Sequence, residues 1–179
     1  MSRALTCRGR HARWAAQRAK VYAAEQFVRT LFDRAAEHRS RVVDFFGTSL
    51  TLPPEGRFAS VESVQAYVDD VLNHPSVQRR WPALMPISVR PRRGVTAAHH
   101  ERRDGAAVIA VPAHRDRWAL RELVVLHEIA HHVCDAAPPH GPEFVATFTE
   151  LAGLVMGPEV EHVLRVVYLK EGLKEGRET

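Results

Sequence analysis

The amino-acid sequence predicts an α+β fold, in which a small antiparallel or mixed sheet packs against several helices. Three observations lead to this prediction. The chain has 179 residues, of which 45% are hydrophobic, so it is long enough to bury one core. Short strand-like segments separated by Gly-containing turns occur together in the middle of the chain. Segments with helical periodicity precede and follow them.

The first segment of the chain is basic and helical. Residues 1–11 are expected to form a mobile tail. From Ala12 to about Arg41 the apolar positions recur with a helical period. We therefore expect residues 1–41 to form a basic tail and an N-terminal helix, and residues 42–179 to form one globular unit.

A hairpin, a helix and three strands are predicted next. Val42–Leu52 suggests a strand or a hairpin bent around Gly47, and Ser60–Leu72 has the apolar face of an amphipathic helix. The last two strands are expected to form a hairpin that leads into the following helix. The three strand candidates are Ile87–Arg92, Val95–Glu101 and Ala106–Val111.

The segment Asp116–Cys134 contains neither Gly nor Pro and is predicted to be one mostly buried helix, with Asp116 as its N-cap. Within it, His127 and His131 are separated by about 40° around the helix axis and about 6 Å along it. Two imidazoles at this spacing can bind one metal ion, and Glu128 between them can reach a metal-bound water. The pattern therefore predicts a zinc hydrolase site in which Glu128 takes the proton of that water.

A catalytic zinc site usually has three protein ligands, so a third ligand is needed. His140 is favoured, because it follows a proline-containing turn that can bring the chain back to the helix. Glu143 remains an alternative, although an acidic residue in the first turn after Pro142 is also explained by the helix dipole. Cys134 is disfavoured, since about 10 Å of helical rise separates it from His127.

Two further helices are predicted after this turn. Pro142–Met156 and Pro158–Lys170 each begin with a proline, which is favoured at the first helical position. Apolar side chains of the first helix are expected to pack under the metal-binding helix, and Gly172 is expected to end the second helix.

The motifs HEIAHHV and HGPEF resemble the SprT-like (Spartan-type) zinc metalloproteases. Residues 81–172 are more closely similar to an uncharacterised group of HExxH metallopeptidases, through RWPALMPISVRPRRG, AAHHE, VIAVP, WALRELVVLHEIAHHV and HGPEF. The resemblance implies a zincin-like fold, a bound Zn²⁺ and Glu128 as the catalytic acid/base. The accessory zinc-binding or DNA-binding segments of the Spartan-type enzymes have no match here, so their DNA-repair role does not follow. The zinc ligands that the resemblance implies are His127, His131 and His140.

The function predicted from these residues is zinc-dependent hydrolysis of peptide bonds in a peptide or protein substrate. In related zinc proteases the strand before the metal-binding helix commonly lines the cleft. Ala106–Val111 is therefore expected to border the site, as an exposed edge to which an extended peptide can add as a strand. Two alternatives stay open: zinc-dependent hydrolysis of a non-peptide amide or ester, and a non-catalytic regulatory module whose metal is structural.

The composition of the chain indicates which partners and which cellular compartment to expect. No apolar run approaches the roughly 20 residues that span a bilayer, so no membrane association is expected. Cys7 and Cys134 are too few for a disulfide framework, and without an export signal we expect a cytoplasmic protein. The net charge of +4 and the basic N-terminal segment leave a nucleic-acid partner open, but no nucleic-acid-binding motif accompanies them. The sequence does not predict an oligomeric state.

Four further histidines lie near the predicted site in the sequence. His99 and His100 should point to opposite faces of a strand, so at most one can face the cleft. His114 precedes the metal-binding helix and is a candidate for stabilising a developing oxyanion. For these three, an ordinary surface or hydrogen-bonded role is favoured. His132 lies about 140° around the helix from His127, so it should not bind the same metal.

Overall fold

The computed structural model describes residues 2–92, 98–103, 105–112 and 120–176, with side chains from residue 12 onward. The α+β class is confirmed, and none of the described helices is both long and apolar enough to cross a membrane. The described elements are α1 (Ser2–Glu37), β1 (Val42–Phe45), β2 (Thr48–Thr51), α2 (Val61–Asn73), α3 (Pro75–Arg80), β3 (Ile87–Arg92), β4 (His99–Arg103), β5 (Ala106–Pro112), α4 (Glu122–Val133), α5 (Pro142–Met156) and α6 (Pro158–Lys170).

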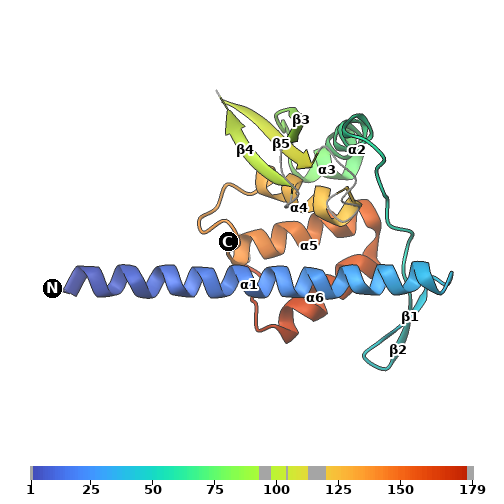
Figure 1. Ribbon diagram of the computed structural model, residues 1–179, viewed down its shortest axis with the longest axis horizontal. Coiled ribbons are helices and arrows are strands. Elements are labelled where there is room, and N and C mark those ends of the chain that lie inside the picture. Colours follow the sequence, from blue (N-terminus) through green and yellow to red (C-terminus); the bar gives the residue numbers. More distant parts are fainter. Residues whose placement is uncertain (1, 93–97, 104, 113–119, 177–179) are drawn as a thin grey trace.

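Helix α1 is a single long helix, and its N-terminal part extends beyond the rest of the chain (Figure 1). The mobile tail predicted for residues 1–11 is wrong, because the described backbone is helical from Ser2. Alanine and arginine are strong helix formers, and the segment contains no proline. The helix ends at Glu37, earlier than the predicted Arg41, and it packs against α6 and β1. Its buried apolar side chains are Val21, Ala24, Val28, Leu31 and Phe32.

The strands β1 and β2 form the hairpin predicted around Gly47. Phe46 and Gly47 have φ angles of 52° and 81°, and two successive positive φ values are typical of a two-residue type I′ turn. The next element, α2, begins after Ser60, whose side chain accepts a hydrogen bond from the Ser63 amide at 3.2 Å. This N-cap accounts for the agreement between the predicted and observed start of the helix.

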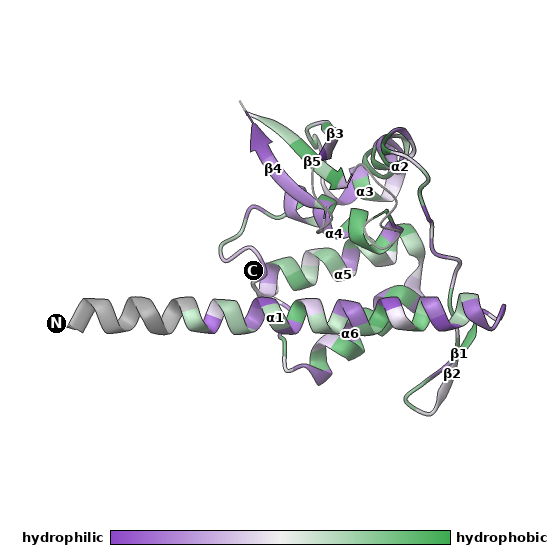
Figure 2. Cartoon of the chain, viewed as in Figure 1, coloured by the Kyte–Doolittle hydropathy of each residue, from purple (hydrophilic) through white to green (hydrophobic). Residues whose placement is uncertain are grey.

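The second sheet is mixed and has the order β3-β5-β4, with β3 parallel and β4 antiparallel to β5. The prediction that Ala106–Val111 forms an exposed edge is therefore wrong, because β5 is paired on both sides. Its uninterrupted apolar sequence is typical of a central strand that is buried on both faces. The edge strands are β3 and β4, and β4 is more hydrophilic than β5 (Figure 2). The predicted strand start at residues 95–97 lies outside the described residues.

Helix α4 is shorter than predicted. Asp116, the predicted N-cap, lies outside the described residues, and the helix begins at Glu122. The preceding Arg121 is extended, with φ −125° and ψ 152°, and forms a β-bridge with Arg57. A tertiary contact therefore sets the start of this helix. Its last residue is Val133, so Cys134 lies at the cap.

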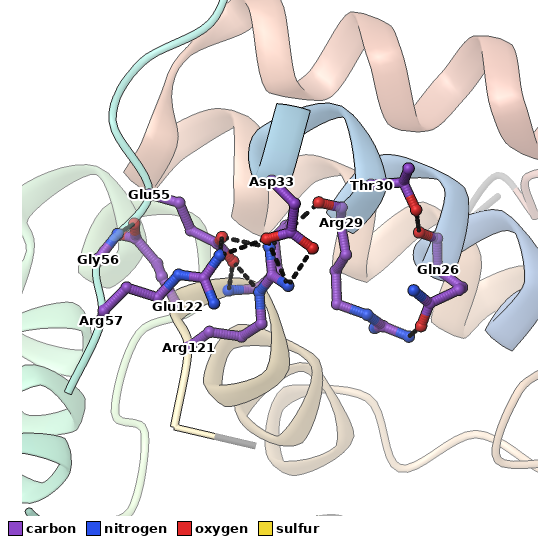
Figure 3. Close-up of polar contacts among 10 residues, drawn as sticks. Gln26, Arg29, Thr30, Asp33, Glu55, Gly56, Arg57, Arg121 and Glu122 are labelled. Atoms are coloured by element: carbon purple, nitrogen blue, oxygen red, sulfur yellow. Dashed lines mark hydrogen bonds and ion pairs between the residues drawn. The ribbon is translucent and has the colours of Figure 1, made fainter. Parts of the chain in front are cut away.

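A partly buried ionic network holds the start of α4 against α1 (Figure 3). The side chains of Arg121 and Glu55 are each 3% exposed, and Arg121 Nε donates to Glu55 Oε1 at 2.7 Å. Arg121 also contacts Asp33 of α1, and Arg57 donates to the same carboxylate at 2.6 Å. Buried charges are tolerated when they are paired in this way, so the network fixes α4 relative to α1.

The helices pack in layers around α4 (Figure 1). One side of α4 contacts β4 and β5 of the sheet, and α5 packs against α4. Helix α5 also contacts α6, which in turn contacts α1. The bounds of α5 and α6 agree with the prediction, because each begins at a proline that follows a glycine. Helix α5 is predominantly hydrophobic (Figure 2), and its buried side chains include Phe144, Val145, Phe148, Leu151 and Ala152.

Candidate metal centre

Three histidines from two parts of the chain converge at the C-terminal half of α4. His127 and His131 lie one turn apart on this helix, as predicted. His140 lies in the turn before α5, where Gln17 of α1 donates to its carbonyl oxygen at 2.9 Å. The Gly141 amide donates to the carbonyl of Pro138 at 2.8 Å and closes the turn. The prediction that His140 returns to the first two histidines is confirmed.

The Nε2 atoms of the three histidines form a nearly equilateral triangle. The distances are 3.1 Å between His127 and His131, 3.2 Å between His131 and His140, and 3.2 Å between His140 and His127. A tetrahedral zinc ion with Zn–N bonds of about 2.0–2.1 Å separates its nitrogen ligands by about 3.3 Å. Three lone pairs facing one another at these distances repel unless a cation lies between them. The triangle therefore fits a bound metal ion.

The protonation states of two of these histidines suit metal binding. Burial, together with the charge of His127, lowers the pKa of His131 to about 2 and that of His140 to about 4. Both imidazoles are therefore neutral near pH 7, which is the form that binds a metal. Phe144 of α5 stacks on His131, with 4.3 Å between the ring centroids, and this contact limits the orientations of the His131 ring.

A buried glutamate of α1 orients the third imidazole. Nδ1 of His127 is 2.9 Å from Oε1 of Glu25, and the hydroxyl of Tyr168 donates to the same oxygen at 3.1 Å. Burial by itself would raise the pKa of Glu25, but His127 and its hydrogen bond, with Arg29, lower it, so Glu25 is an acceptor. Burial by itself would lower the pKa of His127, but the charge and the hydrogen bond of Glu25 raise it. With Nδ1 held by Glu25, Nε2 of His127 faces the other two histidines, where a metal ion would take the place of a proton.

Replacing Glu25 by Gln is expected to weaken the binding of a metal ion at this candidate centre by about 10–100-fold, the usual effect of losing a charged partner of a histidine ligand. The amide keeps the size of the side chain but removes the charge that orients His127. Competition with a chromogenic chelator measures the change in Kd. Glu37→Gln, at the exposed end of the same helix, is the matched control and should leave Kd unchanged. Equal affinities in the Glu25 variant and the control would contradict the role of Glu25.

Glu128 lies beside the three histidines but is not part of their triangle. It is 6% exposed, and its Oε2 accepts a hydrogen bond from the His100 backbone amide of β4 at 2.6 Å. Burial raises the pKa of this carboxyl to about 7, against the opposing effects of His127 and of the His100 hydrogen bond. A carboxyl group with a pKa near 7 can accept and return a proton at neutral pH.

Two cavities meet at Glu128. A cavity of about 400 Å³ lies between β4 and the chain after α4, and its lining includes Glu128, His131 and His140. A cavity of about 500 Å³ lies between α1 and α4 and is lined by His127 and Glu128. Tyr22 and Ala98 line both cavities, so the two spaces adjoin at the candidate metal centre.

The two alternative ligands lie elsewhere. Among the residues that the structure describes, the group of His, Cys, Asp and Glu side chains close enough to share an ion consists of the three histidines alone. Glu143 lies in the first turn of α5 and lines a separate cavity of about 880 Å³. Cys134 lies at the border of this cavity and the one of about 400 Å³, after the end of α4.

The remaining histidines play other parts. The His99 ring contacts Arg92 and Glu101, whereas the His100 ring packs against His132, so the two rings lie on opposite faces of β4 as predicted. His100 binds Glu128 through its backbone amide. His132 is 2.9 Å from the Met85 carbonyl and does not join the metal group, as predicted. His114 lies outside the described residues.

The sequence did not reveal Glu25, Tyr22 or Tyr168 as part of the site. A signal for Glu25 was present, because this carboxylate interrupts the apolar stripe between Val21 and Val28 on α1. A charged residue at a buried position needs a partner. Comparisons of the chain with protein-family models, with curated proteins and with solved structures gave no match. The function of the chain is therefore inferred from the geometry of the site.

Proposed function

We propose that this protein is a zinc-dependent peptidase with a zincin-like active site. The observation on which the proposal rests is the triangle of His127, His131 and His140 Nε2 atoms, with Glu128 next to it on the same helix. Three imidazoles match the ligand set of a catalytic zinc site, which keeps a fourth position for water or substrate. The adjoining cavities give a substrate access to this position.

Each part of the site has a separate task in the proposed mechanism. His127, His131 and His140 would hold the zinc ion, which when bound would supply the Lewis acidity that activates water and a carbonyl group. Glu25 and Phe144 hold the imidazole rings in the orientation that binds the ion. Glu128 takes the proton from the attacking water and returns it to the leaving amine, while the His100 amide fixes the position of its carboxylate.

The strand β4 supports a peptide as the substrate. It is an edge strand, and it borders the cavity that contains Glu128 and His131. An extended peptide can pair with such an edge through backbone hydrogen bonds, which do not depend on its side chains. This pairing would bring a scissile peptide bond alongside the metal-binding helix. We therefore assign to β4 the pairing with a substrate peptide that the sequence predicted for Ala106–Val111.

Two alternatives to a peptidase are a non-catalytic module, which differs in how its metal is enclosed, and a hydrolase of non-peptide amides or esters, which differs in its substrate. A structural zinc ion is usually enclosed by four protein ligands, whereas the described residues bring together three. This difference argues against a non-catalytic module. The same site would also hydrolyse a non-peptide amide or ester if the cleft accepted it, because water activation does not define the substrate.

The proposed function is tested with the purified full-length chain. Metal analysis should find about one zinc per chain, as expected for a mononuclear site. The zinc-loaded protein should hydrolyse casein or short peptides, lose this activity with a chelator and regain it with zinc. Hydrolysis of small acyl substrates without any peptide hydrolysis would favour the amide or ester alternative. Bound zinc without any hydrolysis would favour the non-catalytic module.

A further inference from the structure

Tyr22 of α1 lies where the cavities around the candidate metal centre meet. It lines the cavities of about 400 and 500 Å³ and a third one of about 330 Å³, which extends along α1 toward Trp14. The ring centroid of Tyr22 is 5.7 Å from that of His127, with 21° between the planes, and 5.2 Å from that of His140. Because Tyr22 is 45% exposed, a molecule bound in these cavities can contact it.

The hydroxyl of Tyr22 differs from those of the other two tyrosines. Tyr67 donates to Glu122 Oε1 at 2.7 Å, and Tyr168 donates to Glu25 Oε1 at 3.1 Å, so both hydroxyls hold elements together. The Tyr22 hydroxyl has no hydrogen-bond partner among the residues that the structure describes. A substrate that displaces water from this hydroxyl must replace the lost hydrogen bonds, which favours a substrate with an acceptor at that place.

Three other hydrogen-bond donors around the cavities of about 400 and 500 Å³ are less suited to a substrate oxygen. Nε2 of His100 is buried, and its ring packs against His132. Arg29 is buried and pairs with Glu25 at 3.7 Å, on the side of α1 that packs into the core. Arg102 is exposed at the outer end of β4, where it is 3.7 Å from Asp135. Within the part of the chain that the structure describes, Tyr22 is the donor that combines exposure, a hydroxyl without a hydrogen-bond partner there, and contact with two of the three histidines.

We propose that Tyr22 is a catalytic residue, whose hydroxyl donates a hydrogen bond to the substrate carbonyl oxygen as that oxygen becomes negatively charged. The inference rests on the peptidase function proposed above. A hydrogen bond that strengthens as charge develops lowers the barrier, because it stabilises the transition state more than the bound substrate. The stacking of Tyr22 on His127 and its tilted contact with His140 hold the phenol in place before the substrate arrives.

An amide substrate is hydrolysed by the addition of water and the subsequent loss of the amine. The oxygen of water forms a bond to the carbonyl carbon, and the π electron pair of the C=O bond moves onto the carbonyl oxygen, which accepts the hydrogen bond from Tyr22. Glu128 accepts one proton of the water. The C=O bond then re-forms while the C–N bond breaks, and its electron pair stays on the nitrogen, which receives the proton from Glu128. The products are a carboxylic acid and an amine, and Tyr22 keeps its proton throughout.

Tyr22→Phe tests the proposal, because it keeps the ring over the histidines and removes only the hydroxyl. With zinc-loaded full-length protein and a peptide that the wild type hydrolyses, we expect kcat to fall by about 10²–10³-fold, the usual cost of losing one such donor. KM and the zinc content should stay unchanged. Tyr67→Phe is the matched control, since Tyr67 lines none of these three cavities and its hydroxyl pairs with Glu122, and its kcat should stay within about threefold of the wild type.

Two results would overturn the assignment: a kcat for Tyr22→Phe close to that of the control, or a higher KM with kcat unchanged, which indicates ground-state binding alone. If the wild type hydrolyses no peptide, the peptidase function fails, and Tyr22 is tested by binding. A phosphinic peptide, which mimics the charged tetrahedral species, should then bind zinc-loaded Tyr22→Phe at least about tenfold more weakly than wild type. Equal binding would overturn the role of Tyr22.

Discussion

Glu128→Gln is expected to lower kcat for peptide hydrolysis by about 10²–10⁴-fold, the contribution of a positioned general base. The amide cannot accept the proton of the attacking water. Its oxygen can still accept the hydrogen bond that the His100 amide donates to Glu128 at 2.6 Å. Glu128 is not one of the three candidate ligands, so the zinc content should remain that of the wild type. The fold should also persist, because Gln has nearly the same volume as Glu.

Three measurements separate this result from a general loss of structure. Metal analysis and thermal unfolding of Glu128→Gln should both match the wild type, while the rate of peptide cleavage falls. Glu150→Gln, on the exposed face of α5, is the matched control and should retain full activity, since Glu150 pairs with Arg80 away from the metal centre. Activity in the Glu128 variant equal to that of the control would refute the proposed mechanism.

The elements that were predicted well have boundaries encoded by neighbouring residues. Helices α5 and α6 each begin at a proline after a glycine, and α2 begins after a serine that caps it. The turn of the first hairpin lies at Gly47, where a positive φ is needed. Such signals act within a few residues, so they can be read from the sequence without knowledge of the fold.

The errors occurred where distant contacts decide the structure. The start of α4 depends on Arg121, whose partners Glu55 and Asp33 are 66 and 88 residues away. The central position of β5 depends on its parallel pairing with β3, which no local pattern specifies. An apolar strand before a helix can be an edge strand or a central strand. A continuous apolar run indicates a central strand that is buried on both faces, whereas an alternating pattern indicates burial of one face.

In the candidate site, too, the residues set by local geometry were predicted and those set by distant contacts were not. His127, Glu128 and His131 follow from the geometry of one helix, so their arrangement could be predicted. Glu25 contacts His127 across 102 residues of sequence, and Tyr22 reaches the site from the same distant helix. The division at residue 41 stays a prediction, and in the structure α1 supplies Glu25 and one wall of the cavities.

His140→Ala is expected to weaken zinc binding by more than the roughly 10–100-fold that is typical of losing a residue behind a ligand, because it removes one of the three proposed direct ligands. His127 and His131 would remain, but two imidazoles leave the ion more exposed to water. Hydrolysis should fall together with the zinc content and recover in part at high zinc concentration. Competition with a chelator and metal analysis measure the affinity and the stoichiometry.

Glu143→Ala is the matched variant, because Glu143 was the alternative third ligand and lies only three residues from His140. We expect its zinc affinity to equal that of the wild type, since Glu143 faces the separate cavity of about 880 Å³. Its loss should cost only about 0.3–1 kcal/mol of stability, through the missing charge at the start of α5. The opposite pattern, with zinc lost from Glu143→Ala and retained by His140→Ala, would move the third ligand to Glu143. The pair of variants therefore decides between the two ligands by direct measurement of the bound metal.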